Sequence, residues 1–281
     1  MANVASAVGV ATDSRAWVAF TARAASEMAP FTLYERMTVL NNATRVIIVS
    51  DVHSNVEALR ACIADARDRG GFDRVWSVGD AVGYGPDPRR VIRILRLFGH
   101  RLVAVQGNHE RTALKEGGLE PRPWRWWQHA DYLNSVAMWD SDRDVLRSWP
   151  DEAEDLGFRL VHDPEGRYVS DAWDATRVLG ATTRCQHVVV GHTHAAGYFV
   201  TEAAAVTPEQ DVTGEFVPLR GGDTLEFVPG YRYVINPGGL GQPRDCDRRA
   251  PYLLASIDGA SVTIEARRVA YDVEPTIAKW H

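Results

Sequence analysis

Cysteine is scarce in this 281-residue chain, and its three cysteines, Cys62, Cys185 and Cys246, lie far apart in the sequence. An odd number of widely spaced cysteines provides neither a disulfide framework nor a cysteine-based zinc site. Such cysteine usage is typical of a reducing compartment. We therefore expect a cytoplasmic protein.

Long hydrophobic runs and basic clusters are also missing. The sequence has no run of about 18 apolar residues, so no transmembrane helix is expected. Its first residues carry no positive charge ahead of an apolar segment, so no secretory signal is expected. Lys and Arg number 31 against 37 Asp and Glu, which gives a net charge of −6. Without a basic block, we expect no membrane partner and no dedicated nucleic-acid-binding surface.

Hydrophobic residues make up 45% of the chain, which is enough for one large α/β domain, with two small domains as the alternative. Residues 1–44 are rich in alanine and show no clear periodicity. We expect them to be an N-terminal extension, either loosely ordered or preceding the native start. The alternative is a packing arm that uses Trp17, Phe20 and Phe31. Residues 45–281 are expected to form a single domain.

Five apolar runs, each predicted to be a β-strand, end in residues of metal-binding type. The first, residues 46–49, is followed by Asp51 and His53, whose side chains would point to the same side of an extended chain. Open α/β sheets bind ligands at the carboxyl ends of their strands. The other runs end at Asp80, at Asn108 and His109, at His162, and at His192 and His194. The sequence therefore predicts a site where these strand ends meet.

Helical patterns separate the first three strands. Ser54 and Glu57 form a capping-box pattern before apolar residues at helical spacing, and Asp87 followed by Pro88 is typical of a second helix start. Crossovers of this length predict a parallel sheet. Beyond residue 195, short alternating segments predict an antiparallel half, whose sheet we expect to pack against the first.

Residues 111–155 are predicted to be a helical insertion. This segment contains five tryptophans: Trp124, Trp126, Trp127, Trp139 and Trp149. We expect most of them to form the small core of a cap. The alternative is a wall of the site that stacks on a base or aryl group.

Carboxylates, a carboxamide and imidazoles occupy the strand ends. This mixture of nitrogen and oxygen donors suits Mn, Fe or Zn, and the lack of thiolates argues against a structural zinc site. The donors are too many for one ion but suffice for two if one carboxylate bridges. Two ions about 3.5–4 Å apart are the usual arrangement for displacement at phosphorus. Each residue alone has an ordinary alternative as a turn or surface residue, but the five strand ends together favour a metal centre.

These motifs resemble those of the calcineurin-like metallophosphoesterases, in the branch of small bacterial and archaeal phosphodiesterases. The matching segments, in the family's order, are Asp51-Val52-His53, residues 79–83 (GDAVG), residues 107–110 (GNHE), His162 and residues 191–194 (GHTH). Residues 83–88 and 236–245 resemble this branch in particular. Five ordered motifs are a specific signal. The resemblance covers residue 45 to the C-terminus and implies a two-sheet α-β-β-α sandwich.

The resemblance also implies a phosphohydrolase with two divalent metal ions, Mn first, with Fe, Zn or Ni as alternatives. Asp51, His53, Asp80 and His194 would hold one ion, and Asp80, Asn108, His162 and His192 the other, with Asp80 bridging. A hydroxide between the ions would attack a small phosphodiester or phosphomonoester, a class that includes nucleotides. Asp51 would also hydrogen-bond a ligand imidazole or tune this hydroxide, and His109 would protonate or orient the leaving oxygen. The candidate substrate contacts are Asn55, Tyr84 and Arg244.

The chain departs from the family pattern at three points. Asp163 stands where the family often has Gly and adds a carboxylate near the site, and Gly239 stands where a Ser is usual. Gly83-Tyr84 replaces the Asp-Arg of protein phosphatases, so their phosphate-binding Arg is missing, and Arg244 is the candidate substitute. The missing Arg argues against the alternative of a protein phosphatase or diadenosine tetraphosphatase type. The complete ligand set argues against a non-catalytic scaffold.

Overall fold

The structure is a computed structural model that describes residues 43–115, 118–182, 184–206 and 214–280. Residues 44–281 form one compact unit. The predicted N-terminal extension lies, except for its last two residues, outside the described part of the chain. Within the described part, no helix is both long and apolar enough to cross a membrane.

One six-stranded sheet combines the first three predicted strands with three strands from the C-terminal part of the chain. Its order is β3-β2-β1-β11-β12-β9. The first three strands pair in parallel, and the last three continue the sheet antiparallel. The bounds are β1 Thr44–Val49, β2 Arg74–Val78, β3 Leu102–Val105, β9 Thr224–Glu226, β11 Ala250–Asp258 and β12 Ser261–Val269.

A second six-stranded sheet has the order β4-β5-β6-β10-β7-β8. Its central strands β5, β6 and β10 are parallel, and the outer strands pair antiparallel. The bounds are β4 Glu152–Asp155, β5 Phe158–Val161, β6 His187–Val189, β7 Gly197–Glu202, β8 Val217–Pro218 and β10 Tyr231–Asn236.

The prediction of a separate antiparallel sheet is wrong, because the C-terminal strands divide between the two sheets. β11 pairs with β1, as in Ile47 opposite Leu254, whereas β10 pairs with β6. These partners are distant in the sequence, and the alternation within each strand does not indicate which neighbour it will pair with. Both sheets are therefore mixed.

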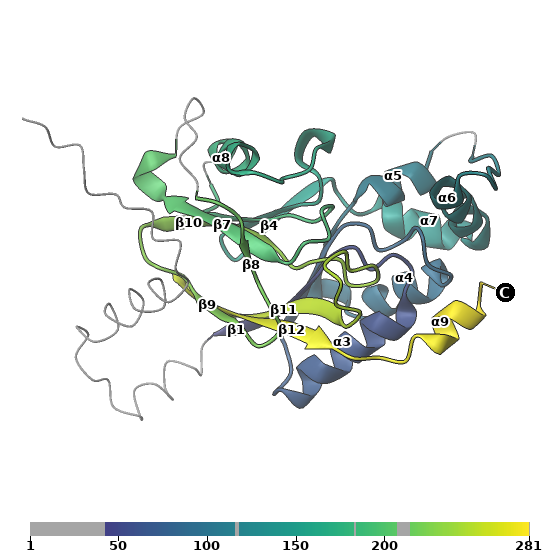
Figure 1. The fold of residues 1–281 in the computed structure, drawn as a ribbon, viewed down its shortest axis with the longest axis horizontal. Helices are drawn as coiled ribbons and strands as arrows, with labels where there is room; N and C mark the ends of the chain where they lie inside the picture. Colours follow the sequence, from purple (N-terminus) through teal and green to yellow (C-terminus); the bar gives the residue numbers. More distant parts are fainter. Residues whose placement is uncertain (1–42, 116–117, 183, 207–213, 281) are drawn as a thin grey trace, which may run out of the picture. The chain divides into compact units, whose positions relative to one another are not determined.

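Helices cover the outer faces of the two sheets, which confirms the predicted α-β-β-α sandwich. Figure 1 shows α3 and α4 along the first sheet and α8 along the second. The bounds are α3 Val56–Asp68, α4 Pro88–Arg96, α5 Asn108–Ala113, α6 Trp126–Ala137, α7 Asp140–Arg147, α8 Ala172–Gly180 and α9 Glu274–Ala278, with short 3-10 helices at Gly99–Arg101, Pro164–Gly166 and Ala203–Ala205.

The core is divided by the first sheet, because alternate residues of its strands face opposite sides. Val46 and Ile48 of β1 pack between the two sheets, whereas Ile47 and Val49 pack toward α3. All four side chains are fully buried. This burial on both faces explains why the strand reads as a continuous apolar run, and it holds the strand end that carries Asp51 rigidly in place.

Local details differ from the predictions at three places. Asn55, not Ser54, caps α3, and its side chain accepts a hydrogen bond from Ala58 N. The end of the insertion is a strand, β4, and the C-terminal helix α9 was not predicted. The expectation of an aromatic core in the insertion is wrong for four tryptophans: Trp124, Trp126, Trp127 and Trp139 are exposed, and Trp149 is buried.

Candidate metal centre

The carboxyl ends of five strands converge on one site, as the sequence predicts. Asp51 and His53 follow β1, Asp80 follows β2, Asn108 follows β3, His162 follows β5, and His192 and His194 follow β6. The chain is not extended at these points, since Asp51, His53, Asp80, His192 and His194 all have φ between 46° and 70°. Left-handed turns, rather than the alternation of an extended chain, direct these side chains inward. Such backbone strain is common at functional sites.

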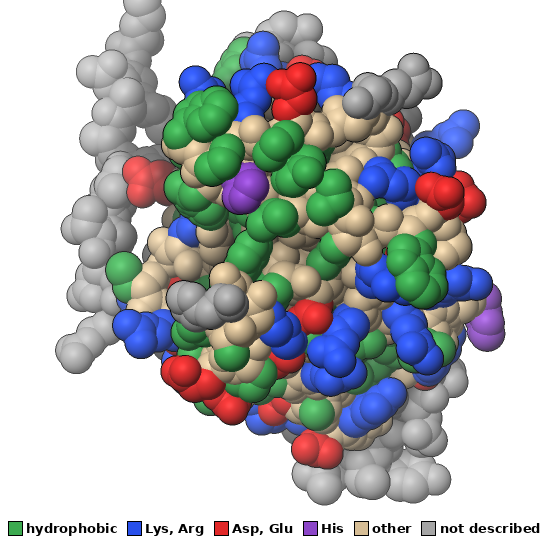
Figure 2. Space-filling model, turned by 90° about the vertical axis from the view of Figure 1, so that its right-hand side faces the viewer, with side chains coloured by type: hydrophobic (Ala, Val, Ile, Leu, Met, Phe, Trp, Pro, Cys, Tyr) green, Lys and Arg blue, Asp and Glu red, His purple; other side chains and the backbone are tan. Residues whose placement is uncertain are grey.

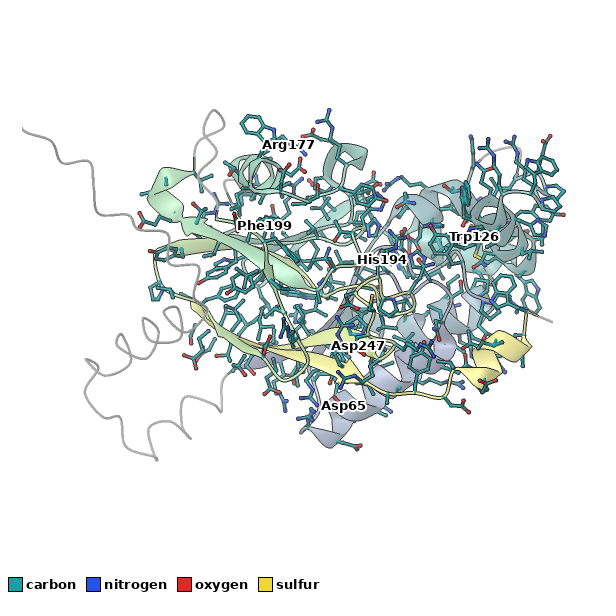
Figure 3. All side chains as sticks on the ribbon, in the orientation of Figure 1. Asp65, Trp126, Arg177, His194, Phe199 and Asp247 are labelled. Atoms are coloured by element: carbon teal, nitrogen blue, oxygen red, sulfur yellow. The ribbon has the colours of Figure 1, made fainter. Side chains whose placement is uncertain are left out.

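The first cluster contains Asp51, His53 and His194, all buried. The Nε2 atoms of His53 and His194 lie 3.1 Å apart. His194 Nε2 is also 3.1 Å from Asp51 Oδ1, and His53 Nε2 is 3.8 Å from the same oxygen. Three donor atoms on three segments therefore face one point. Figure 3 shows His194 at the end of the sheets nearer to α6.

Backbone carbonyls fix the tautomers of both imidazoles. His53 Nδ1 lies 3.1 Å from Val82 O, and His194 Nδ1 lies 2.6 Å from Gln242 O. A carbonyl oxygen only accepts hydrogen bonds, so each Nδ1 carries the proton and each neutral ring has a lone pair on Nε2. Two such lone pairs 3.1 Å apart repel one another unless a cation lies beside both. This arrangement fits a metal ion.

The second cluster contains Asp80, His162 and His192. His162 Nε2 is 3.1 Å from Asp80 Oδ2, and His162 Nδ1 donates to Val78 O at 2.8 Å. Asp80 Oδ2 is also 3.9 Å from His53 Nε2, so this oxygen lies between the two clusters.

Three buried polar atoms at the site make no hydrogen bond within the described residues: Asp51 Oδ1, Asn108 Oδ1 and His162 Nε2. Buried polar atoms are normally paired, and each exception calls for a partner. Together with the other ring nitrogens and carboxylate oxygens, these atoms form a thiolate-free donor set. Such a set suits two divalent cations of the Mn, Fe or Zn type.

The charges of the site favour ionised carboxylates. Burial raises the pKa of the Asp51 carboxyl, but opposing interactions, the positive charge of His162 foremost, outweigh burial and lower the pKa to about 2. Burial also opposes ionisation of Asp80, but His162 and His109 keep its pKa below the usual range. Burial lowers the pKa of His53 to about 3, so this imidazole is a neutral donor at neutral pH.

His162 differs from His53. Burial lowers its pKa, but the carboxylates of Asp80 and Asp51 raise it to about 10. These carboxylates hold a proton on His162 Nε2. A cation would compete with this proton for the same nitrogen.

His109 lies beside both clusters and is held from two sides. Its Nδ1 is 2.6 Å from Asp131 Oδ1, and its backbone N donates to Asp80 Oδ1 at 2.9 Å. Burial lowers its pKa, but Asp131 and Asp80 raise it to about 8. Because Nδ1 faces Asp131, Nε2 is the nitrogen available to a substrate. Asp131 could not be predicted from the sequence, because it lies in the insertion and belongs to no motif.

Glu110 connects the loops that carry the site, and the sequence analysis gave it no role. Its buried carboxylate accepts hydrogen bonds from Asp80 N at 2.8 Å, Gly107 N at 2.7 Å and Val82 N at 3.0 Å. Three backbone N–H groups from two loops thus converge on one side chain. Its position beside His109 in the GNHE segment was the available signal.

The Asp163 carboxylate lies near the site, where its charge acts on His192 and Arg111 forms an ion pair with it. One expectation about a polar residue needs correction. Asn55 is not placed as a substrate contact. Its amide nitrogen donates to Gly241 O and Tyr271 Oη, and its oxygen caps α3.

The other two candidate contacts, Tyr84 and Arg244, lie at the rim. The Tyr84 ring is 4.5 Å from the rings of both His53 and His109, measured between centroids. Desolvation raises the pKa of Tyr84, and the charge of nearby Arg244 acts against this. Tyr168, which the sequence analysis missed, stacks on His192 with its ring centroid at 4.0 Å.

Both glycine departures have a steric reason. A Cβ at Gly239 would lie 2.6 Å from His194 Nδ1, and a Cβ at Gly83 would lie 2.3 Å from His109 Nδ1. Side chains at these positions would displace the two imidazoles. The Gly83-Tyr84 and Gly239 substitutions are therefore compatible with an intact site.

The chain is similar to several known proteins. The family model for calcineurin-like phosphoesterases matches residues 44–196. An uncharacterized protein of Methanocaldococcus jannaschii is 26% identical over 249 residues, which cover 83% of this chain and 90% of that protein. The crystal structure of a metallophosphoesterase from Sphaerobacter thermophilus is similar, with a TM-score of 0.69 and 31% identity, covering 85% of this chain and 93% of that chain.

A symmetrical bis(5′-nucleosyl)-tetraphosphatase of Aeromonas salmonicida is 29% identical over 195 residues, or 67% of this chain. The match spans 63% of that enzyme, somewhat less than two thirds of its length.

Proposed function

The chain belongs to the calcineurin-like phosphoesterase family, and on that premise we propose that it hydrolyses a small phosphodiester or phosphomonoester at a dinuclear divalent-metal centre. The proposed ligands of one ion are Asp51, His53, Asp80 and His194. Those of the other are Asp80, Asn108, His162 and His192. Asp80 is shared.

One observation carries the proposal: the lone pairs of His53 Nε2 and His194 Nε2 face one another at 3.1 Å beside Asp51 Oδ1. When both rings are neutral, neither nitrogen can donate to the other, because both protons are used on carbonyls. The second cluster lies next to this one, and Asp80 Oδ2 lies between them. Two neighbouring cation sites are the arrangement that supports displacement at phosphorus.

Two divalent cations, when bound, would withdraw charge from the phosphoryl oxygens and lower the pKa of water at the site. The chain's own residues supply orientation and a proton. His109, held by Asp131, directs Nε2 toward the substrate and donates its proton to the leaving oxygen. A pKa of about 8 keeps His109 mostly protonated at neutral pH, which suits a general acid.

A second candidate is hydrolysis of a dinucleoside polyphosphate. The relative in Aeromonas salmonicida bears the name of this activity, which favours it. The lack of a phosphate-binding Arg at Tyr84 argues against it. Arg244 lies at the rim and is exposed, so it can reach a substrate there.

The test is a substrate panel on metal-free protein reloaded separately with Mn, Fe, Zn, Ni or Mg. The panel contains p-nitrophenyl phosphate, bis(p-nitrophenyl) phosphate, nucleotides and a dinucleoside tetraphosphate. We expect no activity without metal and hydrolysis of at least one mono- or diester after reloading. His194→Ala is the control, because it removes a ligand and should abolish the regained activity. No hydrolysis of any ester with any metal would support a non-catalytic scaffold instead.

A further inference from the structure

Helix α6 of the tryptophan-rich insertion forms one side of the site. Asp131 holds His109, and Asn134 holds the loop that carries Tyr84. Asn134 Oδ1 accepts from Gly83 N at 3.1 Å, and Asn134 Nδ2 donates to Gly85 O at 2.8 Å. The backbone on both sides of Tyr84 is therefore fixed to α6.

Aromatic rings lead from the metal centre to α6. The Tyr84 ring lies 4.5 Å from the His109 ring, and the Trp126 ring lies 5.4 Å from Tyr84 with an angle of 37° between the planes. Trp126 begins α6 and is 60% exposed. In Figure 3 it lies on α6, beyond His194. Its indole contacts the rings of Tyr84 and Trp127, and most of its surface is open to solvent.

Several large apolar side chains are exposed around Trp126. Figure 2 shows hydrophobic side chains gathered on the face that includes α6. Trp124 and Trp127 on the same segment are also exposed, and Trp127 meets Trp126 edge to face with centroids 6.0 Å apart. Packing does not require Trp126 here, because it belongs to none of the buried clusters. Contiguous exposed apolar groups of this kind mark binding surfaces.

We propose that Trp126, with Tyr84 beside it, is a stacking platform for a nucleobase, and that the substrate is a nucleotide whose phosphoryl group lies at the metal centre. The inference rests on the proposed function, since the metal centre must accept the phosphoryl group. A nucleotide carries its base one sugar away from its phosphate, and Trp126 is one ring, Tyr84, away from His109. Arg244 adds a cation near Tyr84 at the same rim, which suits an anionic ligand.

Stacking makes a specific prediction, because it acts on the base and not on the phosphate. Loss of one base–aromatic stack weakens binding by roughly 5- to 150-fold. Trp126→Ala should therefore weaken a ligand with a base by this factor and leave a ligand without one unchanged. Trp126→Phe keeps a ring and should recover most of the loss. Trp124→Ala is the matched control, since Trp124 is 78% exposed on the same insertion and, among the described residues, has no ring contact with the site.

The experiment is calorimetric titration of the Mn-loaded protein with two phosphonates, the analogues of adenosine 5′-phosphate and of ribose 5-phosphate. A P–C bond replaces the ester bond, so neither ligand is hydrolysed. Metal content is measured for each variant. We expect tighter binding of the adenosine analogue in the wild type, loss of that advantage in Trp126→Ala, recovery in Trp126→Phe, and no change in Trp124→Ala.

Equal binding of the two phosphonates, or an adenosine advantage that survives Trp126→Ala, would overturn the inference while the proposed function stands. Size-exclusion chromatography tests whether a second copy of the chain, rather than a nucleobase, covers this surface. A wild-type oligomer that Trp126→Ala dissociates, without a change in adenosine binding, would make the patch a contact between copies and would also overturn the inference. If neither phosphonate binds and no ester is hydrolysed, the proposed function fails, and the inference fails with it.

Discussion

Single backbone carbonyls determine which ring nitrogen of three histidines faces the site. The carbonyls of Val82, Gln242 and Val78 each occupy the Nδ1 of one histidine and leave its Nε2 to face the site. Such outer contacts orient ligands and set their basicity. The sequence shows which histidines are present, but only the fold shows which nitrogen faces inward.

His109 and Asn108 are neighbours with different proposed roles. His109→Ala should leave metal content nearly unchanged, because the substituted ring is proposed to face the substrate. Turnover should fall by roughly 10²–10⁴-fold, the usual effect of losing a general acid. The fall should be smaller for p-nitrophenyl esters, whose leaving group needs little protonation, than for alkyl or nucleoside esters. The measurement is kcat on both classes, with elemental analysis.

His192→Ala is the comparison for this prediction, since it removes a proposed ligand and should lower metal content. His109 also lies within ligand distance of His53 and Asp80. If His109→Ala loses metal as readily as His192→Ala, His109 is a ligand and its role as an acid is wrong.

Asp131 should set the pH range over which His109 is protonated. Its carboxylate stabilises the imidazolium and contributes to raising the pKa of His109 to about 8. An acid is active below its pKa, so activity should fall as pH rises through that value. Asp131→Asn removes the negative charge, and the pKa should move down toward 6.5 or lower. The alkaline limb of the kcat/KM profile should then shift to lower pH. An unchanged limb would show that His109 does not produce it.

At the scale of elements, the buried amide of Asn134 attaches α6 to the loop that carries Tyr84. Asn134→Ala would leave the buried Gly83 N and Ser54 Oγ, and the partly buried Gly85 O, without this partner. Each unsatisfied buried group costs roughly 1–3 kcal/mol, so the free energy of unfolding should fall by at least about 2 kcal/mol. Urea unfolding of the metal-free protein measures it. Val136→Ala, at an exposed position of the same helix, should change it by less than about 0.5 kcal/mol. Equal values for both variants would contradict the role of Asn134.

The strand ends of the site could be predicted from the sequence, whereas its surroundings could not. Apolar runs that stop at Asp80 or His162 are local signals, and the strands lie where these signals indicate. Strand β4 is polar and alternately exposed, so no apolar run indicates it. Asp131 and Tyr168 come from segments that only the tertiary fold brings to the site. The exposure of Trp126 was also missed, because aromatic residues are buried more often than not.

For the whole molecule, the order of the motifs predicted the two-sheet sandwich. It did not predict which strands belong to which sheet. Strand β11 has the apolar pattern of a central strand, and it could pair with either sheet on that evidence. Its pairing with β1 depends on contacts between distant parts of the chain. Sequence patterns indicate which residues are buried, but they do not by themselves determine which strands become neighbours.

We predict that residues 1–36 are dispensable. Every proposed site residue lies between Asp51 and Arg244, and the family model begins at residue 44. A chain that starts at Met37 should be expressed in soluble form, bind the same amount of metal and keep its metal-dependent activity. The full-length chain, prepared in parallel, is the control. Loss of soluble expression or of activity would show that the N-terminal residues are needed by the domain.

The central claim is that one chain holds two metal ions that share Asp80. The most direct measurement is elemental analysis of the Mn-reloaded wild type and of Asp80→Asn, which keeps the shape of the side chain and removes its charge. We predict two Mn per chain in the wild type and a loss at both sites in the variant, because the shared carboxylate neutralises both ions and fixes their separation. Two Mn per chain in Asp80→Asn, or no bound metal in the wild type, would contradict the account.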